Sequence, residues 1–364
     1  MTLSLYVARR FLMTFLLVAA GFFGIMLAIQ VIEEIRRLGG TGGLARALEL
    51  AILAVPSSVF RILPLIMILS AVALFLALAR SSELVVIRAA GRSALGMLMS
   101  PLLTAVLIGG LAVAVVDPLV AATSKRYDLL SDRYRLGDRA VLSVGREGVW
   151  LRQSGGEGQI VIRAGRASPD GTELTDVTFI AFDAATRPVT RIEAASARLG
   201  DGAWELQDAK EWRLTAGGNP EAGAVSSPRL SVPSDLTRDK IRDSFGKPSA
   251  IPVWELPAFI ASLERAGFSP RRHQVWLQIL LALPALLAAM VLVAAGFTLR
   301  HARSGRTGMM VLLAMVTGFA VFILRNFAQV LGENAQIPVA LAAWSPPIAV
   351  SLLALGLLLH LEDG

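Results

Sequence analysis

Long apolar segments alternate with short charged ones through the first third of the chain. Phe11–Ile32 contains 22 residues without a charged side chain, enough for a helix to cross a hydrocarbon core of about 30 Å. A second run extends from about Leu48 to Ala79 and is interrupted by two prolines and Arg61, and a third run covers Ala94–Val116. No small-residue cleavage site follows the first run, which predicts a retained span instead of a signal peptide.

The middle of the chain has a different pattern, because from about Gly137 to Phe245 the apolar segments are short and several alternate with polar residues. Turns rich in glycine, aspartate and proline separate them, as expected for strands. We predict strands at Val141–Val144, Val149–Gln153, Gln159–Arg163, Val177–Phe182, Val189–Leu199, Trp204–Gln207 and Trp212–Leu214. This pattern indicates an all-β insert, either a sandwich or an open jelly roll.

The last part of the chain returns to the first pattern. An amphipathic helix is predicted at Pro252–Ala266, and three apolar runs follow at Val275–Leu299, Thr307–Leu331 and Ile337–Leu361. The predicted fold class is a polytopic α-helical membrane protein with six transmembrane helices and an inserted all-β, jelly-roll-like domain.

Composition agrees with a membrane protein and sets its orientation. Of the 364 residues, 54% are hydrophobic and only 17% are charged. With the N-terminus inside, the inner side carries Arg9, Arg10, Arg80, Arg88, Arg92, Arg300, Arg303 and Arg306, and the short outer loops carry Arg36, Arg37 and Arg46. This positive-inside bias places the β insert outside the cytoplasm, in the periplasm. The net charge of +7 then indicates an affinity for anionic lipid and not for nucleic acid.

Three domains follow from these patterns. Residues 1–136 hold transmembrane helices one to three, with a cytoplasmic helix at about 80–92. Residues 137–250 form the periplasmic β-jellyroll domain, and residues 251–364 form a connecting helix and transmembrane helices four to six.

The cytoplasmic stretch Ala79–Ser93 has the signals of a short surface helix. Ser82 can cap a helix start, Glu83 falls in the first turn where the helix dipole favours an acid, and Gly91 suits a C-terminal stop. Leu84 and Ile87 repeat at helical spacing. The alternative is a charged hairpin that only marks the membrane boundary.

Four arginines are candidate substrate ligands. Counting about 20 residues back from Arg80 places Arg61 at the outer membrane edge, near Arg36 and Arg37, where guanidinium groups can bind phosphates or carboxylates of an amphiphile. Arg325 lies inside an apolar run, where an ionisable group is costly unless it faces a cavity or a partner. Interfacial snorkelling is the alternative for all four. We expect Lys125, Arg126, Arg133 and Arg135 to form a solvated helix face.

Catalytic machinery is not found in the sequence. The chain has no G-x-x-x-x-G-K-[ST], His-Glu-x-x-His or G-x-S-x-G motif, and it has no cysteines. We therefore predict no catalytic residues, no metal site and no cofactor, and any energy for transport must come from another chain.

The motif after the second span carries a resemblance to a known family. Ser82–Gly91 has the form S-E-L-V-V-x-x-A-x-G, and Leu142–Ser143 is followed by Glu147–Gly148–Val149–Trp150. Together with Trp344–Ser345–Pro346 and the arrangement of three spans, β insert and three spans, this resembles the LptF/LptG family of lipopolysaccharide export permeases. The motif is more similar to LptG members than to LptF members.

This resemblance implies a non-catalytic subunit of an ATP-driven lipopolysaccharide exporter. Its partners would be an LptB-like ATPase dimer, an LptF-like second permease, LptC and LptA. It also implies that Glu83 makes the polar contact with the ATPase and that Leu84, Val85 and Ile87 pack into its groove. Arg36–Arg37 match a paired basic position that contacts lipid A phosphates, whereas Gln30 replaces a further basic position.

Two other classes remain open at this stage. A membrane-anchored periplasmic binding or scaffold module would need neither six spans nor a docking helix. An autonomous secondary transporter would be expected to have midplane acids or visible repeats, and neither is evident.

Overall fold

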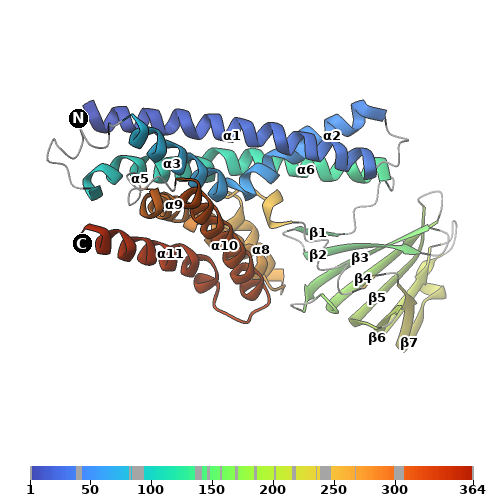
Figure 1. Cartoon of the computed structure of the whole chain (residues 1–364). Coiled ribbons are helices and arrows are strands. Elements are labelled where there is room, and N and C mark those ends of the chain that lie inside the picture. The colour runs from blue at the N-terminus through green and yellow to red at the C-terminus, as the bar shows by residue number, and fades with distance from the viewer. Residues whose placement is uncertain are drawn as a thin grey trace. The chain divides into compact units, whose positions relative to one another are not determined.

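The computed structural model describes residues 2–37, 43–81, 83, 94–135, 142–145, 148–155, 158–168, 171–183, 187–200, 202–214, 219–234, 236–237, 247–266, 268–298 and 307–362. The chain divides into two compact units (Figure 1). The helical unit comprises Met1–Ser131, Ser249–Trp254 and Arg271–Gly364, and the β unit comprises Asp132–Pro248 and Glu255–Pro270.

Long apolar helices build the helical unit. They are α1 (Thr2–Arg37), α2 (Gly43–Arg61), α3 (Leu63–Arg80), α5 (Ala94–Leu111), the π-helix η1 (Ala112–Val116), α6 (Asp117–Arg135), α9 (Arg271–Thr298), α10 (Thr307–Glu333) and α11 (Val339–Glu362). Among the described residues, seven helical segments are long and apolar enough to cross a membrane, with α5, η1 and α6 forming one of them.

Only Ile62 separates α2 from α3. The Ile62 N–H donates to the Ser58 carbonyl at 3.4 Å, and the Ile66 N–H donates to the Ile62 carbonyl at 3.1 Å. Pro64 lies in the first turn of α3, where its missing N–H costs nothing. The backbone therefore continues through Ile62, and α2 and α3 are two parts of one interrupted helical segment.

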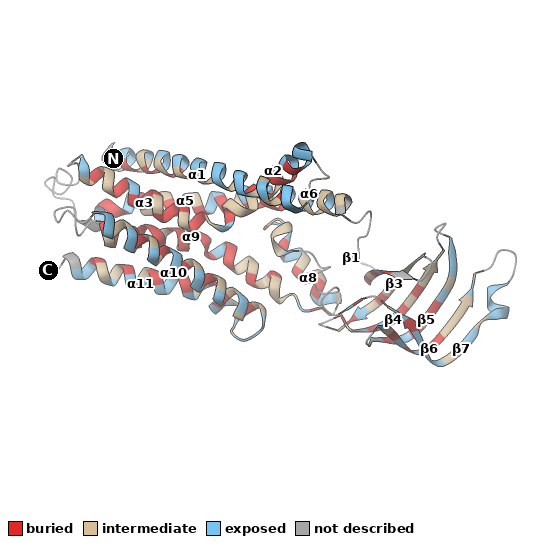
Figure 2. Cartoon of the chain, turned by 45° about the vertical axis from the view of Figure 1, so that its right-hand side comes forward, coloured by how far each residue is buried: buried red, intermediate tan, exposed pale blue. Residues whose placement is uncertain are grey.

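Helix α9 forms the centre of the helical unit and is buried along most of its length (Figure 2). It packs against α3, α5, α10 and α11, which explains why it is apolar on all sides. The contact with α5 is close, since a Cβ on Gly109 would lie 2.5 Å from the Pro284 Cα. Helices α1 and α10 instead expose large apolar side chains, as helices in contact with lipid do.

The β unit contains one antiparallel sheet in which each strand pairs with its neighbour in sequence, in the order β1 to β7. The strands are β1 (Leu142–Gly145), β2 (Gly148–Gly155), β3 (Gly158–Ala167), β4 (Glu173–Phe182), β5 (Pro188–Leu199), β6 (Ala203–Arg213) and β7 (Val225–Pro233). Helix α8 (Leu256–Ala266) covers part of the sheet, with Leu263 in the same core as Trp204 and Phe179.

The predicted all-β insert is confirmed, with a simpler topology than a sandwich: the described strands form one sheet. Two details differ from the prediction. The segments predicted at 204–207 and 212–214 are one strand, β6, in which Asp208 adopts a positive φ of 52° and lies in a gap of the pairing with β5, with the same register on both sides of the gap. Strand β7 was not predicted, because serines and prolines dilute its apolar positions.

Candidate functional site

Arg61, the last residue of α2, lies at about the same level as Arg325 of α10, because helix α3, which follows Arg61, packs against α10. Gly318 of α10 is so close to α3 that a Cβ there would lie 3.0 Å from two atoms of Ile68. Arg325 lies seven residues after Gly318, and Arg61 lies seven residues before Ile68; seven residues are about two helical turns. Arg61 is accordingly the charged group whose repulsion acts on Arg325.

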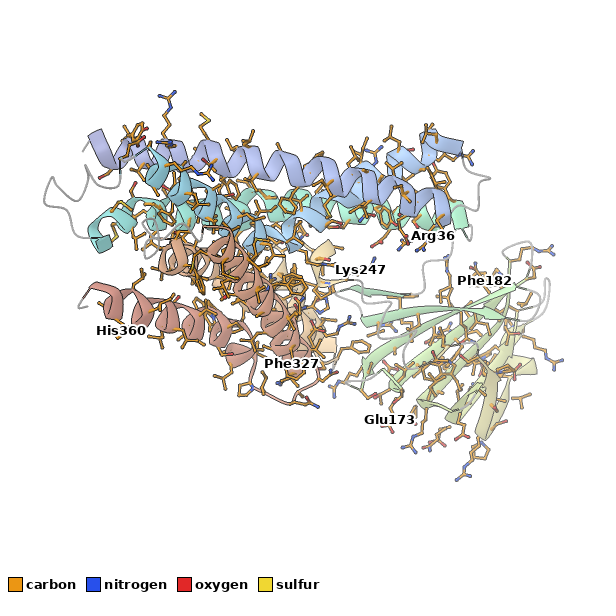
Figure 3. All side chains as sticks on the ribbon, viewed as in Figure 1. Arg36, Glu173, Phe182, Lys247, Phe327 and His360 are labelled. Carbon is orange, nitrogen blue, oxygen red and sulfur yellow. The ribbon has the colours of Figure 1, made fainter. Side chains whose placement is uncertain are left out.

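Arg325 is a buried cation, with an exposed fraction of 7%. Its Nε has no hydrogen-bond partner in the part of the chain that the structure describes, and no ion pair to it is found there. Phe327, which Figure 3 labels, is 60% exposed. It lies two residues after Arg325, about half a helical turn away, so Arg325 lies on the opposite, buried face of α10. The side chain therefore does not snorkel into water, and burying it unpaired is costly.

Arg36 and Arg37 are bound by acids of their own helix. Arg36 donates to Glu33 at 2.6 Å, and Arg37 donates to Glu33 at 3.0 Å and to the Tyr127 hydroxyl at 3.1 Å. Tyr127 in turn donates to the buried carboxylate of Glu34 at 2.7 Å, which ties the end of α1 to α6. The Arg36 side chain is 77% exposed and that of Arg37 44%, so Arg36 is the more accessible cation (Figure 3).

Gln30, which replaces a cation of the resembled family, also holds helices together. Its amide donates to the Ser58 hydroxyl at 2.8 Å and so joins α1 to α2, one turn before Arg61. The exposed side chains of Lys125 and Arg126 agree with a solvated face of α6.

Glu83 is the one described residue of the predicted docking group, and it is already paired. Arg10 of α1 donates to both carboxylate oxygens, at 2.7 and 2.8 Å. Hydrogen bonding from Arg10 holds the pKa of Glu83 below its ordinary value. Leu84, Val85 and Ile87 lie outside the described residues.

A further polar site lies where η1 meets α6. The buried Asp117 carboxylate accepts the Val253 backbone N–H at 2.9 Å, and Trp254 donates from Nε1 to the Ala114 carbonyl at 3.2 Å. A π-helix leaves carbonyl groups such as that of Ala114 without their usual helical partner. The segment 249–254 is thus held against the helix at its irregular turn.

Sequence reasoning missed the groups that pair with the predicted residues. Arg10 was counted only for orientation, and Tyr127, Glu34 and Asp117 were not singled out. Acids and a tyrosine at the ends of apolar runs were the available signal, since such groups need partners in or near a membrane. The partner of each of these polar residues depends on how the helices pack, and the sequence pattern alone does not determine this packing.

These features define a class: a polytopic membrane protein in which two groups of apolar helices flank an inserted β domain. Residues 5–360 match the family described as lipopolysaccharide export system permease LptF/LptG, and the chain belongs to that family. The predicted resemblance is therefore confirmed. The chain is a multi-pass inner-membrane protein and a transporter subunit of the lipopolysaccharide export system.

Curated relatives agree over most of the chain. It is 25% identical over 339 residues to lipopolysaccharide export system permease protein LptG of Escherichia coli (strain K12), which covers 91% of each chain. The protein of the same name from Escherichia coli O6:H1 (strain CFT073) matches with the same identity and coverage.

Proposed function

We propose that this chain is an LptG-type permease subunit that extracts lipopolysaccharide from the inner membrane and passes it to a periplasmic bridge. The observation that carries the proposal is the extent of the family match, which includes both helix groups and the β insert. The LptG assignment within the family is supported by the Ser82–Gly91 motif and by the name of the two curated relatives.

Energy for this extraction comes from ATP hydrolysis on a partner. The sequence contains no phosphate-binding loop. By its resemblance to the LptF/LptG family, the chain would take this energy from an LptB-like ATPase dimer, and an LptF-like permease would complete the membrane part. LptC and LptA receive the lipid from the β domain, which the positive-inside bias places in the periplasm. The segment at about 80–92 docks the ATPase through Glu83, Leu84, Val85 and Ile87.

The outer end of α1 contributes the first lipid contact. Arg36 is the contact we propose for a headgroup phosphate, because it is the more exposed of the two arginines and its acidic partner lies on its own helix. Arg37 acts mainly as a positioning residue, since it contacts Tyr127 of α6 and Glu34 of its own helix.

The test is affinity purification of the full chain from detergent. An ATPase and a second six-span protein are expected to co-purify, and Leu84→Asp is expected to lose the ATPase. A photo-crosslinker at Arg36 is expected to label lipopolysaccharide, with one at the lipid-exposed Leu17 of α1 as the matched position. A chain that purifies without any ATPase, and that shows no lipopolysaccharide adduct from position 36, would contradict the proposal.

A further inference from the structure

Among the described residues, Arg61 and Arg325 lack the acidic partner that Arg36 and Arg37 have. Arg36 and Arg37 are paired with Glu33, whereas in the described part of the chain neither Arg61 nor Arg325 forms an ion pair. The charges at the end of α2 and on α10 repel each other, and that of Arg325 is buried. An anion between them would replace that repulsion by two charge-assisted interactions.

We propose that Arg61 and Arg325 together bind one phosphate group, which joins the end of α2 to α10. This inference rests on the proposed function and adds to it a phosphate subsite separate from Arg36 and Arg37. Guanidinium groups bind phosphate in a planar, bidentate geometry, and a phosphate carries enough oxygens and charge to engage two of them.

The surroundings of the pair suit such a group. Arg61 is exposed and gives access, whereas Arg325 is buried and draws the group into a less solvated position. Ser58 lies one turn before Arg61 on the same face of α2, and its hydroxyl is joined to Gln30 of α1. Gln30 and Ser58 therefore form a small polar surface among the apolar helices, next to Arg61.

Depth in the membrane favours a phosphate carried on a lipid. Arg61 is 19 residues from the inner end of α3, and Arg325 is 18 residues from the inner end of α10. At a rise of about 1.5 Å per residue, both lie roughly 27–28 Å from the inner side. That is close to the thickness of the hydrocarbon core, so the pair lies at the level of outer-leaflet headgroups. Inorganic phosphate is the other source of the same chemistry.

Thermal unfolding of the full chain, purified with the subunits that accompany it, tests this subsite. The probes are bis-phosphorylated lipid A, dephosphorylated lipid A and inorganic phosphate, each titrated against the unfolding midpoint. We expect the phosphorylated lipid to raise the midpoint more than the dephosphorylated lipid does. Arg325→Met and Arg61→Gln should each remove most of that difference, with affinity for the phosphorylated lipid about tenfold weaker.

Matched variants separate binding from folding. Arg325→Met removes an unpaired buried cation and should fold with an equal or higher midpoint in the absence of ligand. Arg325→Lys should keep part of the phosphate-dependent shift, and Arg9→Gln, which removes an exposed arginine from the start of α1, should keep all of it.

The outcomes identify the source of the phosphate. An Arg325-dependent shift seen with the phosphorylated lipid supports a lipid-borne occupant, and one seen with inorganic phosphate alone supports a free one. If neither probe gives an Arg325-dependent shift, the subsite is wrong. If no Arg325-dependent shift is found, but the ATPase co-purifies and position 36 crosslinks to lipopolysaccharide, the phosphate subsite is refuted and the permease proposal is not. If the shift is present but no ATPase co-purifies, the permease proposal fails instead.

Discussion

Arg10 and Glu83 are separated by 72 intervening residues, yet the Arg10 guanidinium donates to both oxygens of the Glu83 carboxylate, at 2.7 and 2.8 Å. The pair joins the beginning of α1 to the residue that follows α3 by three positions. The acid that we propose for docking the ATPase therefore has an intramolecular partner when the chain is alone. Experiments can separate the contribution of the Arg10–Glu83 ion pair to the fold from the contribution of the Glu83 carboxylate to ATPase docking.

Glu83→Gln should sharply reduce co-purification of the ATPase, because the amide lacks the charge that both Arg10 and a docking partner would use. Exchanging the two residues, Arg10→Glu with Glu83→Arg, keeps an intramolecular ion pair but should not restore the ATPase. Arg9→Gln, at the exposed neighbouring position, is the control and should behave as the wild type. Full recovery in the exchanged variant would show that the pair is only structural and would refute the docking role of Glu83.

The contribution of the Arg10–Glu83 pair to stability should decrease at low pH. Arg10 lowers the pKa of folded Glu83 below its ordinary value of 4.5, so the pair stabilises the fold above that value and is lost as the pH falls through the lower, folded pKa. The difference in unfolding midpoint between the wild type and Glu83→Gln should be constant from about pH 8 to about pH 5.5 and shrink below about pH 4.5. A difference that has already vanished at pH 6 would contradict this assignment.

Asp117→Ala should destabilise the helical unit by about 1–3 kcal/mol, because it leaves the buried Val253 N–H without its acceptor. Asp117→Asn keeps a carbonyl oxygen that can accept this bond and should retain most of the stability. Thermal unfolding and limited proteolysis around residues 249–254 measure the effect. Equal unfolding curves for the alanine and asparagine variants would show that this bond contributes little.

Adjacent glycines near the end of α5 offer a test of packing. Gly109→Ala places a Cβ 2.5 Å from the Pro284 Cα, so α5 and α9 must separate, at a cost of about 1–3 kcal/mol. Gly110→Ala has no neighbouring atom within 4 Å and should be neutral or slightly stabilising, by up to about 1 kcal/mol. The measurement is the unfolding midpoint of each variant in the same detergent, and similar midpoints for the two would contradict the close contact.

The positions of the long helices were predictable from the sequence, because crossing a membrane imposes length and apolarity on each segment separately. The interruption of the second run by Arg61 and Pro64 likewise coincides with the break at Ile62. Strand β6 was divided in the prediction because Asp208 and its neighbours have the composition of a turn. In the structure Asp208 adopts a positive φ without ending the strand, and the pairing with β7 has the same register on both sides of it.

The candidate sites were predictable only as a set of residue types. The pattern selected Arg61 and Arg325 separately, and nothing in the spacing indicated that packing of Gly318 on Ile68 brings them to one level. It selected Arg36 and Arg37 as one pair, whereas Tyr127 and Glu34 engage Arg37 and leave Arg36 more exposed. Each of these distinctions depends on contacts between helices far apart in the chain.

The helices on the two sides of Ile62 have different sets of neighbours. Helix α2 packs mainly on α1, whereas α3 packs on the central α9 as well as on α1 and α10. A hinge rotation at Ile62 would therefore carry Arg61 with the outer end of α1 and leave the α3–α9 core undisturbed. Such a rotation would change the distance between Arg61 and Arg325 at the energetic cost of the few backbone hydrogen bonds at Ile62, while the packing of α3 on α9 is kept.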